Sequence, residues 1–224
     1  MYKMAIDATQ ENSNRFMEDL EYIKKGNTSW GEHTRRFIKE NNLPASFLND
    51  LDGAMEIGFR EEFNMNVKSM EEGCIFSYFK AMQLAEEHGY DIKEAKDALP
   101  ICYKAIFDRC LYFIEKGVLV EFHEHEARDA AVEGGFSLQK LEEIMPLGLK
   151  KQFSNHLELI ESGRDDYEKI AETAKTEAEK YGYPVQAVTN AKAVGRKIRE
   201  EITEAAQKAQ KKDDSLEMKI KIRK

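Results

Sequence analysis

Apolar residues recur at a spacing of four along most of this sequence, and this period constrains the fold more than any other feature. Phe47, Leu51, Met55 and Phe59 are each four residues apart, and the stretch from Val67 to His88 follows the same pattern. This spacing places the side chains on one face of an α-helix. Because only four prolines interrupt the 224 residues, long helices are also sterically possible. We therefore predict a mainly α fold.

The composition divides the predicted helices into two groups at Gly163. Bulky apolar residues are frequent up to that point, so we predict a compact multi-helix domain over residues 1–163. Alanine, glutamate and lysine dominate residues 164–212, where small apolar residues form narrow stripes typical of a close-packed helical hairpin or coiled coil. We predict a helical hairpin arm there, which needs a partner from its own chain or another. The predicted helix stops include Gly26, Gly89, Gly117 and Gly182.

The last residues, 213–224, have a different period. Apolar and charged residues alternate strictly there, which predicts a short C-terminal β-strand in a basic tail. A strand needs a second strand for its hydrogen bonds. The candidates are residues 117–122 of the same chain, or a sheet edge on a twin subunit or target protein. A disordered tail with accidental alternation is the alternative. The alternating residues are Leu216, Glu217, Met218, Lys219, Ile220, Lys221, Ile222 and Arg223.

Charge is unevenly distributed along the chain. Residues 192–224 contain 11 Lys or Arg against 6 Asp or Glu, a net charge of +5, which leaves −13 for residues 1–191 of the total −8. An acidic body of this kind repels nucleic acid, so a nucleic-acid partner is disfavoured. The three cysteines form no CxxC pair, which indicates buried thiols and a cytoplasmic location rather than a disulfide framework. No apolar run is long enough for a membrane partner.

The stretch Glu121–Glu126, EFHEHE, contains the residue types that bind metals. If a strand continued from Val118, then Glu121, His123 and His125 would face outward together and could share an ion. On a helix the two histidines would point in nearly opposite directions. Because no third ligand is indicated nearby in the sequence, we predict a polar surface and no metal site.

Motifs for catalysis are absent from the sequence. It has no Gly-rich phosphate-binding pattern and no nucleophile motif. Carboxylate pairs such as Glu61 and Glu62 are adjacent, so they diverge on a helix. We therefore predict no catalytic residues, no cofactor and no enzymatic activity.

Residues 137–157 suggest an alternative function. Two short helices around the turn Pro146-Leu147-Gly148 would loosely resemble the helix-turn-helix of bacterial repressors, which implies DNA binding. The turn is one residue longer than usual and the surroundings are acidic, so an ordinary helix-loop-helix explains the segment as well. The side chains of the second helix that would contact DNA are Lys150, Lys151, Gln152, Ser154 and Asn155.

The favoured function is non-enzymatic protein binding, as an assembly scaffold or an inhibitor-type module. The arm and tail would bind a protein partner or mediate self-association, while the acidic domain anchors them. A DNA-binding transcriptional regulator that uses residues 137–157 is the alternative. The predicted partner-binding residues are Ile198, Ile202, Leu216, Met218, Ile220, Ile222, Lys219, Lys221 and Arg223.

Overall fold

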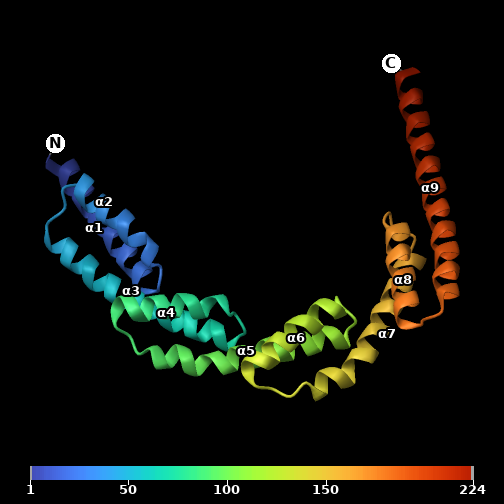
Figure 1. Ribbon diagram of the computed structural model, residues 1–224. Helices are drawn as coiled ribbons and strands as arrows, with labels where there is room; N and C mark the ends of the chain where they lie inside the picture. The colour runs from blue at the N-terminus through green and yellow to red at the C-terminus, as the bar shows by residue number, and fades with distance from the viewer. Residues whose placement is uncertain (1, 223–224) are drawn as a thin grey trace. The chain divides into compact units, whose positions relative to one another are not determined.

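A computed structural model describes the backbone of residues 2–222 and the side chains of residues 11–210. This part of the chain is helical and contains no strand (Figure 1). None of the described helices is both long and apolar enough to cross a membrane. The elements are α1 (Tyr2–Lys24), η1 (Thr28–Trp30), α2 (Gly31–Glu40), α3 (Ser46–Glu71), α4 (Phe76–His88), α5 (Ile92–Glu115), α6 (Val120–Gly134), α7 (Gln139–Glu161), α8 (Tyr167–Tyr181) and α9 (Val185–Ile222).

The chain forms two compact units. Unit 1 comprises Met1–Arg109 with Ala127–Ser137, and unit 2 comprises Cys110–Glu126 with Leu138–Lys224. The predicted division into a domain at 1–163, a hairpin at 164–212 and a tail stays a prediction. Within the predicted arm, the chain does form two helices, α8 and α9, which pack against each other and against α7 in unit 2.

Residues in the left-handed backbone conformation separate the helices at regular intervals, and they include all four predicted stops. Short helices end at Asn42, Gly89, Gly135 and Gly182, and the helices before them end at Gly26, Gly73, Gly117 and Gly163. Glycine and asparagine adopt positive φ at the lowest steric cost. After each short helix comes an apolar residue whose N–H donates to a carbonyl five residues earlier, at 2.8–3.1 Å. This bond closes a Schellman motif. The apolar residues are Leu43, Tyr90, Phe136 and Tyr183.

These intervals reflect an internal repeat of four helix pairs: α2–α3, α4–α5, α6–α7 and α8–α9. Helices α1, α3, α5 and α7 share the pattern Phe-x3-Leu/Val-x2-Ile/Met-x2-Gly, and its copies are spaced 44–47 residues apart. The phenylalanine is buried each time, as is the Ile or Met that precedes the glycine. The repeated residues are Phe16, Leu20, Ile23, Gly26; Phe63, Val67, Met70, Gly73; Phe107, Leu111, Ile114, Gly117; and Phe153, Leu157, Ile160, Gly163.

In α3, α7 and α9 a glycine lies five positions before this phenylalanine position and lets two helices approach closely. A Cβ on Gly58 would overlap the carbonyl oxygen of Ile23, and one on Gly148 would lie 2.5 Å from that of Ile114. Gly195 stands in the same relation to Ile160. Helices α3, α7 and α9 therefore cross the C-terminal turn of the preceding long helix at backbone contact distance.

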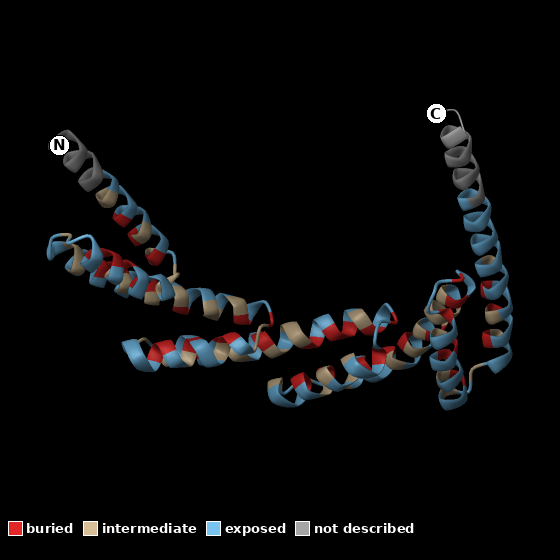
Figure 2. Cartoon of the chain, turned by 90° about the horizontal axis from the view of Figure 1, so that it is seen from above, coloured by how far each residue is buried: buried red, intermediate tan, exposed pale blue. Residues whose placement is uncertain are grey.

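Apolar clusters built on these repeats hold each unit together. In unit 1, Phe16, Phe37 and Leu51 represent a cluster among α1, α2 and α3, while Phe63 and Ala98 represent one among α3, α4 and α5. In unit 2, the helices α7, α8 and α9 form a cluster rich in alanine. Figure 2 shows the buried residues as stripes along one side of each helix. Burial of a large side chain stabilises a fold by about 1.5–3 kcal/mol. The buried faces are therefore the faces through which the helices pack against one another.

Helix α9 carries polar residues at the positions of the repeat that are apolar in α1, α3, α5 and α7. Glu200 and Glu204 stand at the Phe and Leu/Val positions, and Gln207 stands at the Ile position. Residues 199–210 are all exposed, as the pale segment of α9 in Figure 2 shows. A further helix pair stacked on this face would have to bury the carboxylates of Glu200 and Glu204, at high cost.

The predicted C-terminal strand is wrong where the structure describes the backbone, because α9 continues as one helix to Ile222. Alternation over a few residues does not outweigh the absence of a second strand, and α9 satisfies its backbone hydrogen bonds internally. Arg223 lies outside the described residues. The helix expected across residues 67–88 is in fact two, α3 and α4, which Gly73 separates.

Candidate functional site

The segment between α5 and α6 in unit 2 exposes three apolar side chains. Leu119 has a left-handed backbone with φ of 44°, which is unfavourable for a residue other than glycine or asparagine. Its side chain is 66% exposed, and Phe122 on the first turn of α6 is 57% exposed. Val118 is exposed beside them. Unit 2 therefore presents an apolar rim at a strained turn.

This rim borders a pocket of about 590 Å³ in unit 2. Val118, Leu119 and Phe122 line one side, and residues of α7 and α8 line the other. The α7 and α8 side chains are mostly polar, and they include His156 and Glu177. An apolar pocket with a few convergent polar groups is the usual form of a binding site.

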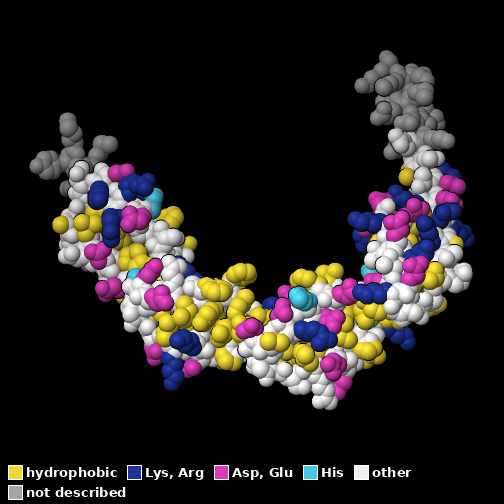
Figure 3. Space-filling view, viewed as in Figure 1, with side chains coloured by type: hydrophobic (Ala, Val, Ile, Leu, Met, Phe, Trp, Pro, Cys, Tyr) yellow, Lys and Arg dark blue, Asp and Glu magenta, His cyan; other side chains and the backbone are white. Residues whose placement is uncertain are grey.

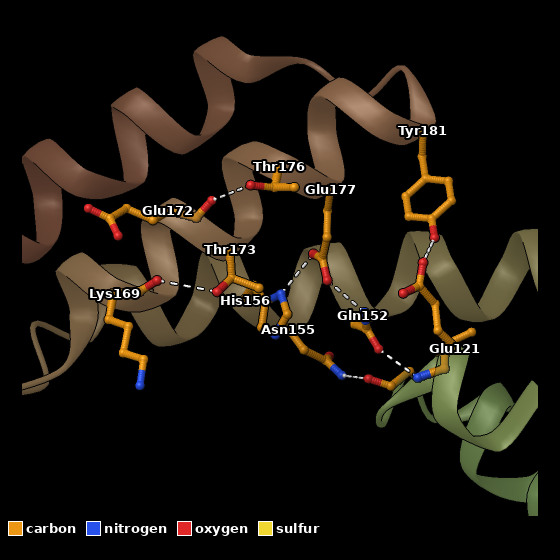
Figure 4. Close-up of polar contacts among 12 residues, drawn as sticks. Glu121, Gln152, Asn155, His156, Lys169, Glu172, Thr173, Thr176, Glu177 and Tyr181 are labelled. Carbon is orange, nitrogen blue, oxygen red and sulfur yellow. Dashed lines mark hydrogen bonds and ion pairs between the residues drawn. The ribbon is translucent and has the colours of Figure 1, made fainter.

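Gln152 on α7 holds the polar side of the pocket in place. Its Oε1 accepts a hydrogen bond from the backbone N–H of Val120 at 2.8 Å, and its Nε2 donates to Glu177 Oε1 at 2.6 Å. Figure 4 shows Gln152 between α6 and α8. The N–H of Val120 belongs to the first turn of α6 and has no partner within that helix. The side chain of Gln152 thus caps α6 and orients Glu177.

Two more side chains from α7 complete the polar network. His156 Nδ1 lies 2.8 Å from Glu177 Oε2, so both carboxylate oxygens of Glu177 have partners. Asn155 Nδ2 donates to the carbonyl oxygens of Lys116 and Gly117, at 3.1 and 3.3 Å. These bonds satisfy the carbonyls at the end of α5, and they fix the turn from which Leu119 projects.

Glu121 links the start of α6 to the end of α8. Its carboxylate accepts hydrogen bonds from Lys180 and Tyr181, and these bonds lower the pKa of Glu121. Figure 4 shows the contact with Tyr181. The same contacts raise the pKa of Lys180, while burial and Glu121 raise the pKa of Tyr181. Near neutral pH the three groups are therefore a carboxylate, an ammonium and a neutral phenol.

The strand geometry considered for EFHEHE is wrong, because Val120–Gly134 is the helix α6. Glu121, His123 and His125 consequently do not share a face. Glu121 belongs to the pocket network, whereas His123 lies against Glu126 one turn further along α6, with Nδ1 and Oε2 3.2 Å apart. Cys110 on α5 approaches the same carboxylate oxygen at 3.6 Å.

The helix-turn-helix expected at residues 137–157 is also wrong, because α7 is continuous from Gln139 to Glu161. Pro146 removes one hydrogen bond inside α7, but buried residues on both sides of it hold the helix to unit 2. Gly148 serves close packing against Ile114 rather than a turn.

The five predicted DNA-contacting residues lie on this single helix. Gln152 and Asn155 make hydrogen bonds within unit 2, and Ser154 is half-buried. Lys150 and Lys151 are exposed. Gln152 and Asn155 are therefore engaged in contacts within unit 2, and DNA binding by the five side chains stays a prediction.

The predicted partner-binding residues all fall on α9 or beyond it. Ile198 is half-buried, close to Gly163, while Ile202 is 50% exposed beside Arg199. The others lie beyond residue 210, outside the described side chains. They are Leu216, Met218, Lys219, Ile220, Lys221 and Ile222 on the last turns of α9, with Arg223 beyond the described backbone.

Sequence reasoning missed the pocket residues His156, Glu177 and Leu119. They are far apart in sequence, so no local spacing joins them. The internal repeat is the signal that could have located the turn, because Gly117 marks the same structural position as Gly26, Gly73 and Gly163.

No protein-family model, curated protein or solved structure matches this chain.

Proposed function

We propose that this protein is a non-enzymatic protein-binding scaffold of the helical-repeat type. The main support for this proposal is the exposed apolar rim of Val118, Leu119 and Phe122 at the pocket in unit 2. Strained backbone that exposes a large apolar side chain lowers stability by about 1–3 kcal/mol, so its presence points to a use in binding. A partner that inserts an apolar side chain into the pocket would bury this rim.

The repeat supports a scaffold role independently of the pocket. Helices α3, α5, α7 and α9 each carry an exposed large apolar residue at the same position, six residues before the phenylalanine position of the repeat. Helical-repeat proteins typically bind partners through side chains presented in this repeated way. Exposed apolar side chains appear on both units in Figure 3. The four residues are Ile57, Ile101, Leu147 and Val194.

Helix α9 is the second proposed contact surface. Its residues 199–210 are uncovered, and Ile202 stands among them as an exposed apolar residue. The net charge of +5 over residues 192–224 favours an acidic amphipathic helix as the partner. Self-association through α9 is the competing arrangement, and sedimentation over a range of protein concentrations distinguishes the two.

Site-specific photo-crosslinking tests the proposal for the pocket. A photoreactive phenylalanine analogue replaces Phe122 in the full chain, which is expressed in its native host and irradiated. We expect a covalent adduct with one defined protein. Leu119→Ser and Phe122→Ser should then weaken binding of that purified protein by about tenfold or more, because each buried apolar side chain contributes at least 1.4 kcal/mol.

Phe76 provides a matched control on unit 1. It is even more exposed than Phe122 but lies outside the pocket, so Phe76→Ser should leave binding of the crosslinked protein unchanged. If the Ser variants at 119 and 122 bind that protein as tightly as the wild type does, the pocket is not the docking site. Loss of binding in an Ile202→Glu variant alone would assign docking to α9.

A further inference from the structure

Three side chains that bind transition metals converge in unit 2, apart from the pocket. Cys110 comes from α5, and His123 and Glu126 come from successive turns of α6. One ligand atom from each residue, namely Sγ of Cys110, a ring nitrogen of His123 and a carboxylate oxygen of Glu126, lies within 4.8 Å of the other two. We propose that Cys110, His123 and Glu126 form a zinc-binding site.

Two of the three distances between these atoms are close to the edges of a tetrahedral zinc site. Sγ of Cys110 and Nδ1 of His123 lie 3.6 and 3.2 Å from the same oxygen, Oε2 of Glu126. Zinc bonds of about 2.0–2.3 Å at tetrahedral angles place neighbouring ligand atoms roughly 3.4–3.6 Å apart. An ion therefore fits between the three atoms after small side-chain adjustments, without movement of the helices.

The surroundings hold the ligands in this arrangement. Cys110 is fully buried, and the ring of Phe113 stacks on the imidazole of His123 at a centroid distance of 4.7 Å and an interplanar angle of 15°. This contact fixes the ring plane that aims Nδ1 at the cluster. Side chains fixed in advance lose less conformational entropy when a metal binds.

The ligand types select zinc over other divalent ions. A thiolate and an imidazole disfavour calcium and magnesium, which prefer six or more oxygen ligands. The thiolate and the carboxylate together neutralise a divalent charge, which a largely buried site requires. The carboxylate side of the cluster reaches the surface, because the side chain of Glu126 is 40% exposed while that of His123 is 13% exposed. A water molecule can therefore supply the fourth ligand, as in three-ligand zinc sites.

Cobalt titration of the full chain tests the proposal, because Co²⁺ reports thiolate and tetrahedral coordination by its absorption spectrum. The protein is first treated with a chelator, and its fold is checked by circular dichroism. We expect one Co²⁺ per chain, a thiolate-to-metal charge-transfer band, and displacement of cobalt by one equivalent of Zn²⁺. Cys110→Ser should abolish the thiolate band, and Glu126→Gln should weaken binding more than about tenfold.

His125→Ala and Cys102→Ser are the matched controls, since His125 is not in the cluster and Cys102 is a buried thiol in unit 1. Both variants should bind cobalt as the wild type does. If Cys110→Ser fails to fold, Glu126→Gln and His123→Ala decide, because both side chains are partly exposed. A folded wild-type chain without a stoichiometric thiolate band, or folded His123 and Glu126 variants with unchanged affinity, would falsify the site.

Discussion

Gly58 of α3 packs its Cα directly against the carbonyl oxygen of Ile23 at the end of α1, where a Cβ would overlap that oxygen. Equivalent glycines occur in α7 and α9, so this crossing is a recurrent element of the repeat. It explains how helices with few bulky residues between them still pack at close range.

Gly58→Ala should destabilise unit 1 by about 1–3 kcal/mol, because a backbone atom cannot move aside for the added methyl group. Gly53 in the same helix is the matched control, since nothing lies within 4 Å of its Cβ position. Gly53→Ala should instead stabilise the protein by about 0.5–1 kcal/mol through helix propensity. Urea unfolding measures both. Equal effects of the two substitutions would contradict the close crossing.

The repeat also predicts which equivalent positions carry stability. Phe63 is fully buried among α3, α4 and α5, so Phe63→Ala should cost about 3–5 kcal/mol. Glu200 occupies the same repeat position in α9 but is exposed, and Glu200→Ala should change stability by no more than about 0.5 kcal/mol. Chemical denaturation followed by circular dichroism checks the pair. A large loss for Glu200→Ala would mean that another surface covers this face of α9.

Gln152 is expected to be the most sensitive polar residue of the pocket. Gln152→Ala leaves the N–H of Val120 and one oxygen of Glu177 without their partners, which should cost about 1–3 kcal/mol. Gln186→Ala, which removes an exposed hydrogen bond to Asn190 within α9, should be nearly neutral. Hydrogen exchange at the start of α6 should accelerate only in the Gln152 variant. Unchanged exchange there would show that Gln152 does not cap the helix.

Glu121 should stabilise the folded protein near neutral pH and lose this effect at low pH. Lys180 and Tyr181 lower the pKa of Glu121 below the ordinary value of 4.5. The carboxylate of Glu121 therefore binds a proton more readily in the unfolded state than in the folded state. The contribution of Glu121 is therefore present above about pH 4.5 and disappears as the pH falls through the lowered pKa. The effect should be small, because the Glu121 and Lys180 side chains are more than half exposed.

Comparison of the wild type with Glu121→Gln measures this contribution. The wild type should unfold at a higher urea concentration near pH 7, and the two midpoints should converge as the pH falls through the lowered pKa of Glu121. Concentrated salt should reduce the difference near pH 7, because it screens exposed charges. A difference that persists at low pH would point to packing rather than charge.

The helices were largely predictable from local sequence, and their contacts were not. A spacing of four, with Gly26, Gly89, Gly117 and Gly182 as stops, reflects forces that act within a few residues. Proline was misleading at position 146, because buried residues on both sides of it keep α7 continuous. The alternation after residue 213 failed for the corresponding reason, since a strand depends on a distant partner.

The candidate sites depend on juxtapositions that no local pattern encodes. Cys110 meets His123 only because α5 and α6 turn back on each other at Gly117 and Leu119. Gln152 meets Val120 across more than 30 residues of sequence. The internal repeat is present in the sequence, but its spacing varies between 44 and 47 residues, so a comparison at one fixed period misses it.

The equal lengths of the repeated segments have a consequence for how such a chain can change over time. From the Phe position to the terminal glycine, α1, α3, α5 and α7 have the same number of residues and share the four pattern positions. A gene segment that encodes one helix pair could be duplicated or excised between two of these glycines, and each new junction would join surfaces that already fit. Growth or shortening by whole modules would therefore keep the shared segment intact at every joint, which favours changes of length by whole helix pairs.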